Sequence, residues 1–113
     1  MGGNSIFISG KITGDPNYRY KFFKAEEELR EKGYTKIMNP AMLPEGFEWG
    51  DYMDITMAML KACDTIYLLA DWNESQGARI ERVLAVACGH TILYQDPLDA
   101  PKNAPETPNK NND

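Results

Sequence analysis

The chain has 113 residues, enough for one small domain with a single core. Its net charge of −5, from 17 acidic and 12 basic residues, gives no general attraction to nucleic acids or anionic membranes, so neither is an expected partner. No apolar run approaches the ~20 residues that span a bilayer, and the first residues lack the pattern of a secretory signal. We therefore expect a cytoplasmic protein.

Strands and helices are predicted to alternate along the chain. Short apolar runs such as "SIFIS" indicate strands, whereas helical period places Tyr18, Phe22, Ala25 and Leu29 on one face of the first helix. A loop with two prolines, "NPAMLPEGFEWG", is long enough to be functional. The expected elements are strand 5–9, helix 17–32, strand 34–38, helix 51–62, strand 65–70, helix 76–87 and strand 90–94.

This alternation predicts one α/β domain over residues 1–94, with a parallel sheet of about four strands and helices on both faces. Right-handed crossovers favour the flavodoxin-like, Rossmann-like strand order 2-1-3-4. Residues 95–113 are rich in Pro and Asn and are expected to form a flexible tail. Ligands of such sheets bind beyond the carboxyl ends of the strands where the order reverses, which here lies between the first and third strands.

The two cysteines, Cys63 and Cys88, each lie in an apolar periodic segment, which predicts two reduced thiols buried in the core. Cys88 and His90 lack the paired spacing of a zinc site, so no metal site is expected.

Glu81 lies near the start of the last predicted helix. Its neighbours Ile80, Val83, Leu84 and Ala87 follow the i, i+3, i+4, i+7 rule and are predicted to form the buried face, which puts Glu81 about 100° away, near the crevice. From spacing alone, two interpretations of Glu81 are open. It is either a surface carboxylate, stabilised by the helix dipole or by a nearby cation, or a catalytic carboxylate.

Two segments, "IFISGKITG" and "CDTIYLLADWNESQGARIERVLAVACGH", resemble the nucleoside 2-deoxyribosyltransferase-like superfamily. The landmarks "ISG-ITG", "NP", "CD" and "S-GAR-E", spread over residues 6 to 94, most resemble an uncharacterised subfamily of short phage and bacterial proteins. The resemblance implies an enzyme that cleaves or transfers the N-glycosidic bond of deoxynucleosides or their 5'-monophosphates. Its partner would be such a small molecule, and no cofactor is implied.

By this resemblance, Glu81 matches the nucleophile that attacks the anomeric carbon. Ser75 matches a position that is Asp in the nucleoside transferases and Ser in the monophosphate hydrolases, where it holds phosphate; a helix N-cap is an equally sound interpretation. Lys11 is expected near the phosphate or 5' end and Asn39 in the loop that lines the site. The expected substrate contacts are Gly10, Lys11, Asn39, Asp54, Thr56, Ser75 and Gly77.

Two positions depart from the superfamily pattern. Phe7 stands where a Tyr helps to orient the nucleophile, and Thr56 stands where an Asp faces the sugar. Asp54 is near in sequence, but two residues correspond to about 200° of rotation around a helix. The alternative function is therefore a catalytically silent nucleotide-binding or sensor protein.

The helix 51–62 is apolar over most of its circumference. One stripe is expected in the core; the second is either buried in the monomer or, as we expect, covered by another copy, since the superfamily forms homo-oligomers. The aromatic loop residues are expected either to stack on a base or to anchor the loops in the core. The first stripe is Met53, Met57 and Leu60, the second is Tyr52, Ile55 and Met59, and the aromatic loop residues are Phe47, Trp49 and Trp72.

Overall fold

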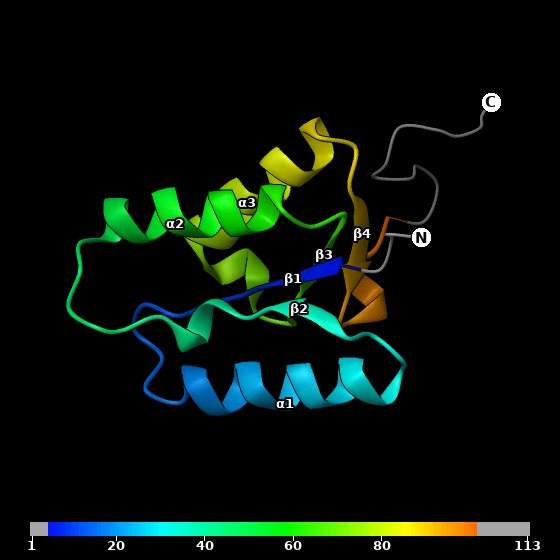
Figure 1. The fold of residues 1–113 in the computed structure, drawn as a ribbon, viewed down its shortest axis with the longest axis horizontal. Coiled ribbons are helices and arrows are strands. Elements are labelled where there is room, and N and C mark those ends of the chain that lie inside the picture. Colours follow the sequence, from blue (N-terminus) through cyan, green and yellow to red (C-terminus); the bar gives the residue numbers. More distant parts are fainter. Residues whose placement is uncertain (1–4, 102–113) are drawn as a thin grey trace.

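The computed structural model describes residues 5–101 of the chain, in which strands and helices alternate (Figure 1). Short 3-10 turns lie between several of these elements. The strands are β1 (Ser5–Ser9), β2 (Lys36–Met38), β3 (Thr65–Leu68) and β4 (Thr91–Tyr94), and the helices are α1 (Tyr18–Glu31), α2 (Trp49–Lys61) and α3 (Gln76–Ala87).

The four strands form one sheet in the order β2-β1-β3-β4, and every neighbouring pair is parallel. The predicted fold class and strand order are therefore confirmed. The order reverses between β1 and β3, because the chain adds β2 on one side of β1 and continues on the other. Ligand sites of parallel sheets lie at this point, beyond the carboxyl ends of the strands.

The strand β1 divides the core into two layers. Successive side chains of a strand point to opposite faces, so Ile6 and Ile8 pack with Phe22 of α1, whereas Phe7 packs with Leu60 of α2 and other residues on the far side. Figure 1 shows α1 on one face of the sheet and α2 and α3 on the other. The predicted face of the first helix is confirmed, since Phe22, Ala25 and Leu29 are buried and Tyr18 packs against them.

The chain remains structured beyond the predicted end of the domain. Gln95 donates its backbone N–H to Leu68 O at 2.8 Å, and its side-chain oxygen accepts from the N–H of Ala70 at 2.8 Å. A 3-10 turn follows at Pro97–Asp99. Gln95 thus pairs with the end of β3 and the residue Ala70 that follows it, and the remainder of the expected tail, 102–113, lies outside the described residues.

The two cysteines differ in environment. Cys63 is buried, and burial raises the pKa of its thiol to about 11. Cys88 is exposed, so the prediction of a second core thiol is wrong. The reason is that Cys88 caps the end of α3 on a side of the helix that faces away from the core. Within residues 5–101, no helix is long and apolar enough to cross a membrane.

Candidate functional site

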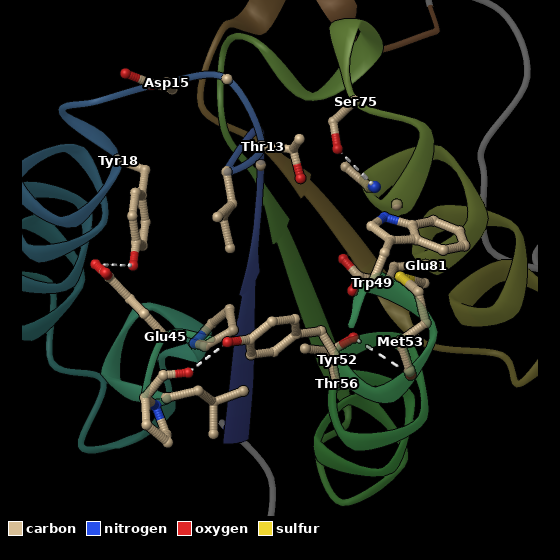
Figure 2. A pocket seen from close by; sticks show the side chains of 18 of the residues that line it. Thr13, Asp15, Tyr18, Glu45, Trp49, Tyr52, Met53, Thr56, Ser75 and Glu81 are labelled. Atoms are coloured by element: carbon tan, nitrogen blue, oxygen red, sulfur yellow. Dashed lines mark hydrogen bonds between the residues drawn. The ribbon is translucent and has the colours of Figure 1, made fainter. Parts of the chain in front are cut away.

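A pocket of about 630 Å³ opens at the carboxyl ends of β1 and β3, where the strand order reverses. Five segments line it: the loop after β1, the start of α1, the loop after β2, and the N-terminal parts of α2 and α3. Figure 2 shows Tyr18 and Glu45 on one side of this space and Trp49, Met53 and Glu81 on the other. The location agrees with the crevice expected from the fold alone.

The carboxylate of Glu81 lies at the inner wall of the pocket, and only 6% of the residue is exposed. Ser9 Oγ donates a hydrogen bond of 2.6 Å to Glu81 Oε1. Burial raises the pKa of Glu81 above its ordinary value, and hydrogen bonds from the hydroxyls of Ser9 and Thr56 partly oppose this increase. The site thus holds a desolvated carboxylate that accepts a hydrogen bond from Ser9, while the nearby Thr56 hydroxyl donates to Met53 O at 3.4 Å.

Glu81 reaches the pocket because α3 presents a different face from the one predicted. Its buried residues are Ala78, Glu81 and Ala85, whereas Ile80 and Val83 are exposed by 37% and 63%. The prediction that Ile80, Val83, Leu84 and Ala87 form the buried stripe is therefore wrong for all but Leu84, which packs against the core. Small side chains at Ala78 and Ala85 allow the helix to approach the sheet closely, with Glu81 between them.

Ser9 was missed by the sequence analysis. It is the last residue of β1 and lies on the same face as Phe7, because side chains two positions apart in a strand share a face. Phe7 is fully buried in the core, while Ser9, nearer the carboxyl end of the strand, contacts Glu81. The available signal was a hydroxyl at the end of an otherwise apolar buried strand.

Four of the expected substrate contacts line the pocket together with Glu81, namely Gly10, Thr56, Ser75 and Gly77. Ser75 also caps α3, since its Oγ accepts from the N–H of Ala78 at 3.0 Å. Gly10 is constrained by packing, because a Cβ at this position would lie 2.8 Å from Leu69 Cδ1.

The other three expected contacts lie outside the pocket lining. Asn39 is a structural residue: its side chain accepts from the N–H of Ala41 and donates to Glu26, which fixes the turn after β2. Asp54 is exposed on α2, as expected from its rotation relative to Thr56. Lys11 Nζ lies 3.8 Å from a carboxylate oxygen of Glu74. As substrate contacts, these three residues stay predictions that the pocket lining does not support.

Aromatic side chains contribute to the pocket, but only one of the three that the sequence singled out does so. Trp49 lines the pocket from the first turn of α2. Phe47 packs edge-on against Tyr52, and Trp72 packs against Tyr94. Tyr18 and Tyr52, which the sequence analysis assigned to helix faces, also line the pocket.

Tyr52 and Met59 have contacts within their own chain. The hydroxyl of Tyr52 donates to Pro44 O at 2.5 Å and accepts from the N–H of Phe47, so this side chain holds the loop after β2 (Figure 2). Met59 packs against the core. The second stripe of this helix is therefore largely used in the monomer, and Ile55 is its exposed member.

Ion pairs connect the elements that surround the mouth of the pocket. Lys21 Nζ donates to Asp15 at 2.5 Å, to Asp71 and to Lys11 O, which joins α1 to the loops after β1 and β3. The hydrogen bond from Lys21 is the main reason that the pKa of Asp15 is lowered. In the part of the chain that the structure describes, no three His, Cys, Asp or Glu side chains are grouped closely enough to hold a metal ion.

Comparison with known sequences identifies a family for this chain. No curated protein matches it significantly. The model of a domain of unknown function, DUF4406, matches residues 4–94, which include the strands, the α-helices and the pocket-lining residues of the part of the chain that the structure describes. The chain therefore belongs to the DUF4406 family.

Proposed function

We propose that this protein cleaves or transfers the N-glycosidic bond of a deoxynucleoside or its 5'-monophosphate, with Glu81 as the nucleophile. The observation that carries the proposal is the Glu81 carboxylate itself, buried at the wall of an open pocket and held by Ser9 Oγ at 2.6 Å. Burial of a carboxylate is costly to the fold, and buried carboxylates with a raised pKa cluster at functional sites. The resemblance to the nucleoside 2-deoxyribosyltransferase-like superfamily supplies the reaction class.

In the proposed reaction, a Glu81 oxygen bonds to the anomeric carbon as the bond from that carbon to the base nitrogen breaks. The electron pair of the broken bond leaves with the base, which takes a proton. Water or a second base then attacks the same carbon, loses a proton that balances the one taken up by the departing base, and releases the Glu81 carboxylate. Desolvation makes the ionised Glu81 more basic, and the hydrogen bond from Ser9 orients it toward the sugar.

A specific observation favours a second candidate, a nucleotide-binding protein without catalysis. The helix position at which the resembling enzymes carry an Asp is Thr56, whose hydroxyl contacts Glu81 and cannot act as an acid at neutral pH. Such a protein would bind the same ligands in the same pocket and release no base.

Incubation with deoxynucleosides and deoxynucleoside monophosphates, followed by chromatography, separates the two candidates. The wild type should release free base, and Glu81→Ala should reduce the rate by at least about 10⁴-fold, because no other group replaces the nucleophile. Mass spectrometry of the acid-quenched protein should find a deoxyribosyl adduct on the peptide that contains Glu81.

Two controls accompany this test. Glu31→Ala, at an exposed glutamate of α1, should keep full activity. Glu81→Gln should melt at or above the wild-type temperature, since it removes a buried charge, so that loss of activity is not loss of fold. Binding without base release from the wild type would support the silent protein instead, and full activity of Glu81→Ala would refute the nucleophile assignment.

A further inference from the structure

The charged side chains that line the pocket are all acidic. They are Asp15 and Glu45 near the mouth and Glu81 at the inner wall. Of the described residues, no Lys, Arg or His is among those that line the pocket. A ligand with a negative charge would therefore enter a space whose walls carry the same sign.

The nearby cations are already engaged by carboxylates. Lys21 binds Asp15 at 2.5 Å and also binds Asp71. Arg19 Nη1 lies 3.5 Å from Glu45, and its other nitrogens donate to the backbone of the loop after β2. Lys11 is oriented toward Glu74. A phosphate would have to compete with these carboxylates for each cation.

The N-terminus of α3 is the remaining feature suited to binding phosphate, but neighbouring side chains weaken phosphate binding there. Ser75 Oγ accepts from the N–H of Ala78 and so acts as the helix cap. Glu81 lies on the same helix, its side chain in the same pocket. A phosphate carries a charge of about −1.5 to −2 at neutral pH, and repulsion from Glu81 in a partly desolvated space would weaken its binding.

The aromatic side chains of the lining, together with the Glu45 carboxylate, suit a nucleoside without phosphate. Tyr18, Trp49 and Tyr52 offer flat aromatic surfaces for a base. Glu45 accepts from the hydroxyl of Tyr18 at 3.5 Å and, being exposed, can also accept from sugar hydroxyls or a base amino group. The sugar hydroxyls and the base amino group are hydrogen-bond donors, and carboxylates in the pocket lining accept hydrogen bonds from such donors.

We propose that the ligand of this pocket is an unphosphorylated nucleoside, and that the carboxylates at its mouth discriminate against the 5'-monophosphate. This inference rests on the proposed function and names its substrate class. It assigns Glu45 a role in specificity, because the ion pair of Glu45 with Arg19 is long, at 3.5 Å, and exposed at the mouth, whereas Asp15 is held by Lys21 at 2.5 Å.

The test compares each of the four common deoxynucleosides with its own 5'-monophosphate. We expect kcat/KM for base release to be at least about tenfold higher for the nucleosides. Glu45→Gln should raise kcat/KM for the monophosphates and so narrow the ratio by about threefold or more. Glu48→Gln, at an exposed glutamate that does not line the pocket, should leave the ratio unchanged.

The outcomes separate this inference from the proposed function. Equal or faster cleavage of the monophosphates would overturn the inference and leave the proposed function standing. If neither class releases base, the proposed function fails, and calorimetric titration with the same compounds decides the inference. Tighter binding of the nucleosides would then support it. Equal or tighter binding of the monophosphates, or no binding of either, would overturn it.

Discussion

Glu81 is subject to two opposing influences on its pKa. Burial raises the pKa, and the hydroxyls of Ser9 and Thr56 lower it in part. Because its folded-state pKa lies above the unfolded value, this group contributes stability that is present at low pH and lost as pH rises through the folded pKa. Ionisation of this carboxylate is therefore made at a cost to the fold, as expected of a functional group rather than a structural one.

The Ser9 hydroxyl offers a direct test of this balance. Ser9→Ala removes a donor to the ionised form of Glu81, so the pKa of Glu81 should rise further. Because the nucleophile must be ionised, the acid limb of the kcat/KM profile should move to higher pH, with activity on that limb falling about tenfold. Measurement of the pH–rate profile, with NMR titration of the Glu81 carboxyl, checks both statements.

Ser9→Thr keeps the hydroxyl and should restore the wild-type profile, which separates the hydrogen bond from the volume of the side chain. If Ser9→Ala lowers activity equally at all pH values and leaves the NMR titration of Glu81 unchanged, Ser9 acts only through packing and the assigned role is wrong.

The sequence indicated some residues of the site and not others, for physical reasons. Glu81 and Ser75 were assigned by resemblance, because the motif that carries them lies within a few residues at the start of one helix. Ser9 was missed because its contact with Glu81 joins residues 72 positions apart, and only the packing of α3 on β1 brings them together. Lys11 and Asn39 were assigned by position in a loop, which does not specify where a side chain points.

At the scale of elements, α3 shows that the hydrophobic period of a helix does not by itself predict which of its faces packs on the sheet. Ile80 and Val83 obey the helical rule, and yet they are exposed, while Ala78 and Ala85 are buried beside Glu81. A period identifies an apolar stripe but does not say whether the sheet or another surface covers it. Here close approach of the helix to the sheet favours small residues, so the larger ones lie outside.

Gly10 shows a second constraint between elements. Its Cα packs against Leu69 so closely that a Cβ would lie 2.8 to 3.0 Å from three atoms of that side chain, one of which is Leu69 Cβ. Gly10→Ala should therefore destabilise the fold by about 1–3 kcal/mol. Thermal or denaturant unfolding followed by circular dichroism measures the change.

The matched control is Gly50→Ala in the first turn of α2, where an added Cβ would meet no atom within 4 Å. This change should be neutral or stabilise by up to about 1 kcal/mol, because Ala favours helix over Gly. Equal stability of the two variants would contradict the packing argument at Gly10.

At the scale of the whole molecule, the topology was predictable because few arrangements satisfy alternating strands and helices with right-handed crossovers. The location of the pocket followed from the same rule. The residues that line the pocket could not be predicted from this rule. Glu45 and Tyr52, for example, come from a loop and a helix whose relative placement depends on hydrogen bonds such as that of Tyr52 to Pro44.

The exposed apolar side chains also bear on association. Homo-oligomer formation was expected through the helix 51–62, but Tyr52 and Met59 are used within the chain. Ile55 on α2 and Ile80 and Val83 on α3 are instead exposed by 40%, 37% and 63%. An apolar face can pack against its own copy across a two-fold axis, so we propose that a second copy of this chain covers Ile55, Ile80 and Val83.

Sedimentation velocity tests this expectation with one substitution on each face of the sheet. The wild type should sediment as a dimer or larger species, and Val83→Glu should give a monomer, because a charge buried without a partner in an apolar interface is strongly unfavourable. Tyr20→Glu makes the same kind of change at an exposed side chain of α1, on the opposite face, and should leave the oligomer intact. A wild type that is monomeric at all concentrations would contradict association altogether. An oligomer that survives Val83→Glu would exclude this surface and direct attention back to Met57, a partly exposed residue of α2.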